Sequence, residues 1–276
     1  MNGTIPVDIG GNDMPFWTIK PLYFGYTSGK TADQKDCTIP WTGFFLTDGQ
    51  MKVLCDTGVK DGFFVDGKSP FGFPSAGDEA HVRKALEKIG VKPEEIEMVI
   101  YTHFHWDHAG NCHLFPNATH VFQDQEWKEL LDPLPSMQFL KVYDQRVIPE
   151  FEKLRCRRIT GDLEFLDGLE LIHAPGHSAG GQCLRVKTQE GSFIIAGDLF
   201  NTYFMAYPET TEWTRLDGTR IPLDPEVRRF LMGAFLITVY DHYAWYRSQY
   251  RILGMVRSPK FLIPSHDASI LSKTFG

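Results

Sequence analysis

The sequence predicts an α/β fold in which helices cover layered β-sheets. Short β-rich segments follow one another in hairpin-like pairs, and segments with helical spacing of apolar residues stand between them. Strands in meanders with interspersed helices pack naturally as a layered sandwich. Nucleotide-binding folds are disfavoured, because no G-x-G-x-x-G or P-loop sequence opens a helix. We expect one domain over residues 1–276.

The first half of the chain is predicted to consist mostly of strands. Asp48-Gly49 stands between two apolar runs and is a strong hairpin signal. A helix is expected over 79–89, capped by Asp78 and ended by Gly90, because apolar residues recur there at helical spacing. The other expected elements are an irregular lead-in over 1–15, a strand over 16–26, a polar loop over 27–36, strands over 42–46 and 51–56, a long loop over 62–77, and a strand over 97–101.

The second half continues with strands and then becomes aromatic. Asp167-Gly168 gives a second hairpin signal between strands over 163–166 and 169–173. Residues 199–258 are predicted to form an aromatic insertion, largely helical from Pro225 onward. The other expected elements are a strand over 119–123, a helix over 125–131, mixed loop and helix over 132–158, strands over 182–186 and 192–196, and a last strand over 260–264.

Composition narrows the class of protein and its compartment. Apolar residues make up 42% of the 276 positions, enough for a sizeable core, and a formal charge of −7 argues against general nucleic-acid binding. The five cysteines are odd in number and form no C-x-x-C pair, which fits reduced thiols in the cytosol. The N-terminus lacks a secretory signal, and the longest apolar run, 234–237, is too short to span a bilayer. We therefore expect a cytoplasmic protein that acts on a small molecule, without nucleic-acid or membrane partners and with no prediction of oligomeric state.

The densest chemical signal is HFHWDH, which follows a short buried strand and precedes a Gly-Asn turn. Neutral imidazoles and a carboxylate suit zinc, iron or manganese. Side chains at i and i+2 of an extended segment share a face, so His103 and His105 can bind one ion together. Asp107 and His108 aim elsewhere, which suggests a second ion. The alternative is a polar loop whose histidines only form hydrogen bonds.

Three further apolar strands end in a possible metal ligand: His177, Asp198 and His266. With the four residues of the motif they make seven donors, too many for one catalytic zinc, which keeps about three protein ligands. Two ions about 3.5–4 Å apart that share a carboxylate would use them all. The expected assignment places His103, His105 and His177 on one ion, Asp107, His108 and His266 on the other, and Asp198 as the bridge, with zinc as the expected metal.

These motifs resemble the metallo-β-lactamase superfamily. The matching segments, in chain order, are Asp56-Thr57-Gly58, the stretch 102–108, His177, Gly197-Asp198 and His266. The resemblance implies an αββα sandwich with the metals at one edge. Within the superfamily the chain is most similar to the N-acyl homoserine lactonase branch, through Trp106, the Ala-Gly-Asn that follows the motif, and His266-Asp267. That branch carries a substrate-contacting tyrosine three residues after the bridging aspartate, where this chain has Asn201, and its nearest tyrosine is Tyr203.

The leading functional hypothesis is hydrolysis of a lactone, an ester-like bond, by attack of a hydroxide that bridges two metal ions. Asp107 would carry a proton to the leaving oxygen, and Tyr203 is a candidate hydrogen-bond donor to the substrate carbonyl. One alternative is a hydrolase of a thioester, phosphoester or β-lactam. Another is an oxidoreductase with a single iron, similar to persulfide dioxygenases. A metal-stabilised binding protein without turnover is the last alternative.

Several other residues have two possible roles each. Asp56 and Asp267 could hydrogen-bond a metal-ligating histidine or only cap a turn. A metal-free structural role is favoured for His113, His120 and His173, for the pair Asp241-His242 and for Cys112. The aromatic residues of the insertion could cover the metal edge and shape an apolar pocket, or form an interface or ordinary core; these are Tyr203, Phe204, Tyr207, Trp213 and the stretch 235–246.

Overall fold

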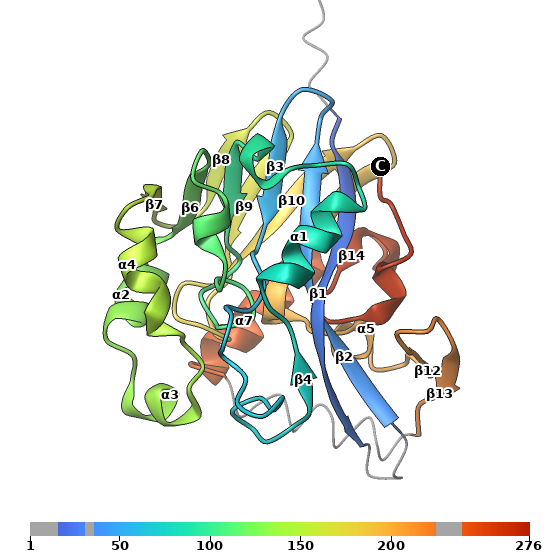
Figure 1. Ribbon diagram of the computed structural model, residues 1–276. Coiled ribbons are helices and arrows are strands. Elements are labelled where there is room, and N and C mark those ends of the chain that lie inside the picture. Colours follow the sequence, from blue (N-terminus) through green and yellow to red (C-terminus); the bar gives the residue numbers. More distant parts are fainter. Residues whose placement is uncertain (1–15, 31–35, 225–238) are drawn as a thin grey trace, which may run out of the picture.

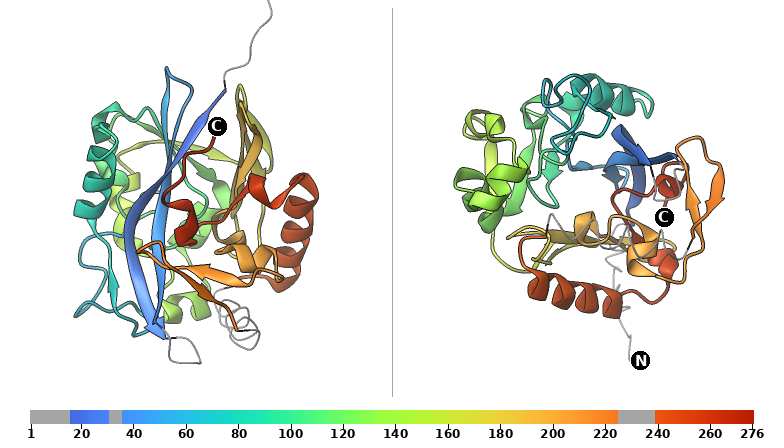
Figure 2. Two further views of the ribbon diagram at one scale, coloured as in Figure 1. Left: turned by 90° about the vertical axis from the view of Figure 1, so that its right-hand side faces the viewer. Right: turned by 90° about the horizontal axis from the view of Figure 1, so that it is seen from below.

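The computed structural model describes residues 16–30, 36–224 and 239–276. Two β-sheets face each other, and helices cover their outer faces, with α1 (Glu79–Glu87) outside the first sheet and α7 (His242–Met255) outside the second (Figures 1 and 2). The αββα order that the sequence implied is therefore confirmed. None of the helices in the described ranges is both long and apolar enough to cross a lipid bilayer.

The first sheet is built from residues before position 160. Its seven strands run in the order β4-β1-β2-β3-β5-β6-β7, antiparallel through β1, β2 and β3 and parallel from β3 to β7. The strands are β1 (Thr18–Lys30), β2 (Asp36–Thr47), β3 (Lys52–Cys55), β4 (Ser75–Ala76), β5 (Met98–Ile100), β6 (Thr119–Gln123) and β7 (Arg155–Ile159).

The second sheet is built from residues after position 160. Its five strands run in the order β14-β11-β10-β9-β8, with β14 parallel to β11 and the other neighbours antiparallel. They are β8 (Leu163–Leu166), β9 (Leu169–His173), β10 (Gln182–Thr188), β11 (Gly191–Ile195) and β14 (Leu262–Ile263). A separate hairpin pairs β12 (Glu212–Thr214) with β13 (Arg220–Pro222).

Alternation along the strands divides the apolar side chains among three core layers. Cys183 and Leu184 are neighbours on β10, yet Cys183 packs outward beneath α7, whereas Leu184 packs between the sheets. The layer between the sheets also holds Phe44 and Phe193. The third layer lies between the first sheet and the helices α1, α2 (Asp124–Leu131), α3 (Pro135–Leu140) and α4 (Ile148–Phe151). With both outer faces covered, polar chemistry is left to the loops at the strand ends.

The hairpins and strands with clear turn signals are confirmed, with shifts of a few residues at their ends. Three predictions are wrong: residues 27–30 continue β1 instead of starting a loop, β4 lies inside the expected loop over 62–77, and β7 was expected to be loop or helix. The last strand is confined to Leu262–Ile263, because Pro259–Phe261 forms a 3-10 turn. Much of the predicted helical stretch after Pro225 lies outside the described residues, and α7 is the part that the structure describes.

Candidate metal centre

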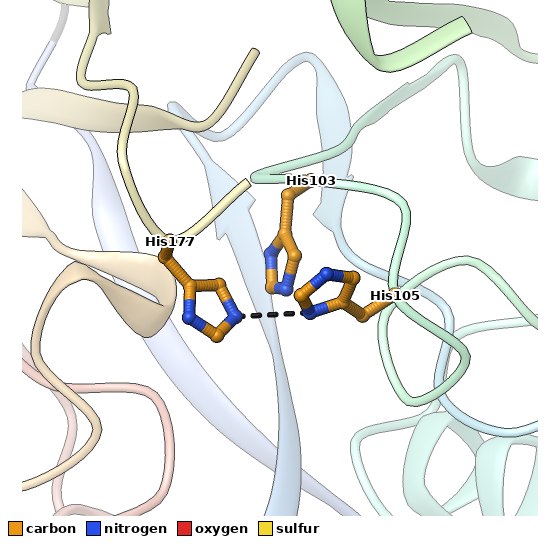
Figure 3. Close-up of side chains that lie close together, drawn as sticks. All are labelled: His103, His105 and His177. Carbon is orange, nitrogen blue, oxygen red and sulfur yellow. Dashed lines mark hydrogen bonds between the residues drawn. The ribbon is translucent and has the colours of Figure 1, made fainter. Parts of the chain in front are cut away.

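Three imidazoles converge from two loops to form the first group of possible metal ligands. His103 and His105 follow β5, and His177 follows β9; all three are buried, and their ligand atoms lie within 4.8 Å of one another. Nδ1 of His105 is 2.9 Å from Nε2 of His177, and Figure 3 shows the three rings turned toward a common point.

A second group lies beside the first and combines carboxylates with imidazoles. Asp107, His108, Asp198 and His266 are all buried, with ligand atoms within 4.8 Å of one another. Nε2 of His266 is 2.9 Å and Nε2 of His108 is 3.2 Å from Oδ1 of Asp198. Asp107 extends Oδ2 to 3.5 Å from the same His108 nitrogen. The structure therefore brings together all seven residues that the sequence singled out.

Asp198 stands between the two groups. Its Oδ1 faces His108 and His266, while its Oδ2 lies 3.4 Å from Nε2 of His177 in the first group. Two neutral donors fix the carboxylate: the Ser265 hydroxyl donates to Oδ1 at 2.7 Å, and the Asn201 amide donates to Oδ2 at 3.0 Å. The sequence analysis noted Asn201 only as a departure from the lactonase branch and missed Ser265, whose position directly before His266 was its only signal.

The far sides of the imidazoles are held by hydrogen bonds that turn the remaining nitrogen toward the site. Nδ1 of His108 lies 2.9 Å from Oδ2 of Asp56, and Nδ1 of His266 lies 2.8 Å from the carbonyl oxygen of Pro40. Such partners fix the ring orientation of metal-binding histidines. Asp56 thus contacts a candidate ligand as well as ending a turn. Its backbone φ is 64°, a value that is uncommon outside glycine.

The residues present fit a pair of metal cations. Nε2 of His103 and of His108 are buried without a hydrogen bond to any residue in the described ranges, although an Asp198 oxygen lies 3.2 Å from the latter. Buried polar atoms normally have a hydrogen-bond partner, so these two nitrogens are available to bind a metal ion instead. Five imidazoles and two carboxylates form a donor set that zinc and similar divalent ions accept.

Burial and charge set different protonation states in the two groups. Burial lowers the pKa of His103 and His105 well below the usual histidine range and that of His177 to about 4, so these rings are neutral at pH 7 and can offer a lone pair. In the second group burial acts in the same direction, but Asp107 and Asp198 outweigh it and raise the pKa of His108. The two buried carboxylates therefore favour the protonated, positively charged form of His108. A bound cation would supply the same positive charge beside them.

The Tyr203 prediction is not supported by the geometry. Its hydroxyl donates to the carbonyl oxygen of Leu262 at 3.0 Å, and Nζ of Lys273 lies 5.6 Å from its ring centroid. Tyr203 opens the short helix α5 (Tyr203–Ala206), and its backbone N–H donates to Asp267. This turns the ring toward a cavity of about 540 Å³ that Phe193 and Phe275 also line. Asp267 accordingly caps local backbone and does not contact a candidate ligand in the described structure.

The insertion could cover the metals with an apolar pocket, form an interface or pack as ordinary core, and Phe204, Tyr207 and Trp213 pack as core. Phe204 and Trp213 pack against each other at 5.5 Å in the layer beneath α7. Tyr207 packs against the same layer. The stretch 235–246 lies only partly within the described residues, where Asp241 caps α7 and His242 is exposed. Ordinary core packing, the alternative that the sequence left open, accounts for these side chains.

The remaining candidate residues keep away from both donor groups. His120 is buried and hydrogen-bonds Tyr101, and His113 contacts Glu79. His173 ends β9, and Cys112 is buried beside Glu150. Their metal-free roles agree with the sequence analysis.

A different set of aromatic residues borders the metal centre. The Trp106 ring stacks on Phe63, with the two ring centroids 4.9 Å apart. Trp41 packs edge-to-face against His266 at a centroid distance of 5.2 Å, and Tyr143 against His105 at 5.1 Å. Phe63 and Tyr143 also line a cavity of about 520 Å³. Sequence reasoning missed Phe63 and Tyr143, because both stand in segments without a periodic pattern.

Comparison with known proteins links this geometry to a family. The sequence profile of the metallo-beta-lactamase superfamily matches residues 52–266. An N-acyl homoserine lactonase of Bacillus thuringiensis is 28% identical over 202 residues, which cover 66% of this chain and 76% of that protein. The enzyme of the same name from Bacillus cereus is 26% identical over 198 residues, covering 64% and 74%.

Solved structures show the same fold. A quorum-quenching N-acyl homoserine lactone hydrolase superposes with a TM-score of 0.66 at 22% identity, covering 92% of this chain and 94% of that one. The dizinc quorum-quenching lactonase AidC, in complex with its product, gives a TM-score of 0.60 at 16% identity, covering 92% and 88%. At these identities the structural likeness bears on the fold alone.

Proposed function

The chain belongs to the metallo-beta-lactamase superfamily, and from that premise we propose that it hydrolyses a lactone at a pair of divalent cations. The observation that carries the proposal is the convergence of seven donors into two groups with Asp198 between them. The names of several relatives support the same class of reaction, since two that are 26–28% identical to this chain are N-acyl homoserine lactonases.

We propose that His103, His105 and His177 hold one cation and that Asp107, His108 and His266 hold the other, with Asp198 shared. Zinc is the metal we expect, because this mixture of imidazole and carboxylate donors suits it. Two bound cations would lower the pKa of a coordinated water to roughly 7 and polarise the ester carbonyl. Because the Asp198 carboxylate is held by hydrogen bonds and the five imidazoles already lie close together, these side chains would need to move little during the reaction.

Asp107 is the residue we assign to proton transfer. It is buried, and burial raises the pKa of its carboxyl although His108 and His266 oppose the change. A carboxylate with a raised pKa can accept a proton and pass it on, which suits delivery to the leaving alkoxide. The ring-opened product would then be one hydroxy acid, which carries a neutral hydroxyl group and a carboxylate.

The aromatic border of the site supports a substrate with an apolar acyl group. Phe63 stacks on Trp106, Tyr143 lies beside His105, and the cavity of about 520 Å³ that Phe63 and Tyr143 line is large enough for a small ligand. The rest of the cavity lining includes charged side chains, among them Lys141, Asp144 and Arg146.

The decisive experiment is a hydrolysis screen of the metal-loaded protein, with the metal-free protein as the control. The panel contains lactones of varied ring size and acyl length, with thioesters, phosphotriesters and a β-lactam as comparators. We expect lactones to be opened fastest, and faster as the acyl chain lengthens. Preference for a comparator would replace the lactone assignment, and elemental analysis that finds one iron per chain would favour the oxidoreductase.

The proposed cellular location is the cytoplasm. All five cysteines are free in the described structure, and four of them are buried, so the fold needs no disulfide. Labelling of thiols in intact cells before and after lysis tests this: we expect full reduction inside the cell.

A further inference from the structure

The helix α2 places a carboxylate directly behind the first group of imidazoles. Glu126 is only 1% exposed, and its two oxygens accept backbone hydrogen bonds from two different loops. Oε2 accepts from the N–H of Phe104 at 2.8 Å, and Oε1 accepts from the N–H of Gly180 at 2.6 Å. Charge-assisted hydrogen bonds of this kind are about twice as strong as neutral ones.

The two donors belong to the segments that carry the metal ligands. Phe104 stands between His103 and His105, and Gly180 follows His177 by three residues. One side chain therefore connects the two loops that supply all three imidazoles of the first group.

The packing at Gly180 shows how closely this loop rests on α2. A Cβ at Gly180 would lie 2.8 Å from the backbone nitrogen of Glu126, closer than real Cβ contacts come. The loop that follows His177 is thus held against the first turn of α2 by both contact and hydrogen bond.

We infer that Glu126 is a positioning residue for the first metal ion: it sets the distance between the His103–His105 segment and His177. The inference rests on the metal centre of the proposed function. Its oxygens bond to the loops of the first group, so a change in Glu126 should act on the ion held by the three imidazoles and leave the ion held by Asp107, His108 and His266 little changed.

The substitution Glu126→Gln tests this with little change in volume. An amide has one acceptor oxygen, so one of the two N–H groups loses its partner and faces the amide NH₂ instead. The matched control is Glu129→Gln on the same helix. Glu129 is also buried, but in the described structure its Oε1 accepts a hydrogen bond from the N–H of Leu134 at 3.4 Å, not from the ligand loops.

The measurement is a titration of the metal-free proteins with zinc in competition with a chromophoric chelator. We expect two ions per chain in the wild type and in Glu129→Gln. In Glu126→Gln one of the two ions should bind about 10–100-fold more weakly while the other keeps its affinity. In a His177→Ala background, Glu126→Gln should add little, because the first group is already incomplete.

Gly180→Ala gives a second route if Glu126→Gln fails to fold, because it lifts the same loop from α2 while leaving the carboxylate in place; the same ion should weaken. Equal weakening of both ions in Glu126→Gln, or equal effects of Glu126→Gln and Glu129→Gln, would overturn the positioning role. A wild-type protein that binds no zinc would instead remove the proposed function, so the two failures are distinguishable.

Discussion

The hydroxyl group of Thr102 determines which nitrogen of His103 carries the proton and which carries the lone pair. The Thr102 hydroxyl donates to Oδ2 of Asp56 at 2.8 Å, and the backbone N–H of Thr102 donates to Oδ1 of the same carboxylate. Having given its hydrogen to Asp56, the hydroxyl accepts from Nδ1–H of His103 at 3.1 Å, which leaves Nε2 of His103 as the lone pair. Asp56 therefore orients His108 directly and His103 through Thr102.

The variant Asp56→Asn tests this relay. An asparagine keeps one acceptor oxygen but cannot serve Thr102 and His108 together, so both ions should bind about 10–100-fold more weakly by chelator competition. Asp48→Asn is the control, because within the described part of the chain Asp48 accepts hydrogen bonds from the backbone N–H groups of its own turn alone. If Asp56→Asn behaves like Asp48→Asn, Asp56 is no more than a turn cap.

The variant Asp107→Asn separates binding from chemistry at the second group. Loss of the carboxylate removes both a donor and the proposed proton carrier, so kcat should fall by about 10²–10⁴-fold and zinc content should drop toward one ion per chain. Steady-state kinetics and elemental analysis measure the two effects. Asp132→Asn, an exposed substitution at the end of α2, provides the baseline. Near-normal turnover of Asp107→Asn would refute its assigned role.

The buried His120 should contribute to acid sensitivity independently of the metals. Burial lowers the pKa of His120 to about 4, while the unfolded chain titrates near 6.5. The unfolded state therefore binds more protons between these values, and stability falls by up to about 3 kcal/mol as pH decreases from 6.5 to 4. In His120→Gln the unfolding free energy should depend less steeply on pH over this range, measured by urea denaturation of metal-free protein. The exposed His242→Gln is the comparison, and equal slopes in the two variants would contradict the prediction.

At the scale of elements, α7 supports the turn that presents His177. Gly176 has a φ of 136°, and a Cβ there would lie 2.2 Å from the Cα of Trp245 in α7. The Ser248 hydroxyl adds a bond to the carbonyl of Pro175 at 2.7 Å. The helix is thus packed directly onto the Pro-Gly turn before the ligand.

The variant Gly176→Ala should push α7 from this turn. We expect a loss of about 1–3 kcal/mol in unfolding free energy from overpacking, together with weaker binding of the first ion. Gly254→Ala in the same helix meets no neighbour within 4 Å and should instead stabilise the protein by about 0.5–1 kcal/mol. Chemical denaturation measures both, and a Gly176→Ala variant as stable as wild type would show that the turn can move away from α7.

The elements that could be predicted from the sequence are those whose signal lies within a few neighbouring residues. β8 and β9 were placed to the residue, because Asp167-Gly168 separates two apolar runs. β7 was missed because its sequence, RCRRI, is exposed at four of five positions and its place at the sheet edge depends on backbone pairing with β6. In the site, the donors were predictable from strand ends. Glu126, Phe63 and the orientation of Tyr203 were not, since each depends on contacts between distant segments.

At the scale of the whole molecule, bound metal should raise stability substantially. A ligand that binds only the folded state at 100 times its dissociation constant adds about 2.7 kcal/mol, so removing each ion should lower Tm by roughly 5–10 °C. Protons compete for His177 and its neighbours, so the gap between metal-loaded and chelated protein should narrow as pH falls toward 4. Scanning calorimetry at several pH values checks this. A gap that is absent, or constant with pH, would contradict the proposed donor set.

The two sheets come from consecutive stretches of the chain, one before residue 160 and one after it. Four of the seven donors belong to the earlier stretch and three to the later one, the last being His266. During synthesis, neither stretch can capture both cations alone. Loading of both proposed cations therefore becomes possible only after β14 has joined its sheet and the layers have met, which makes complete metal uptake a marker of finished assembly.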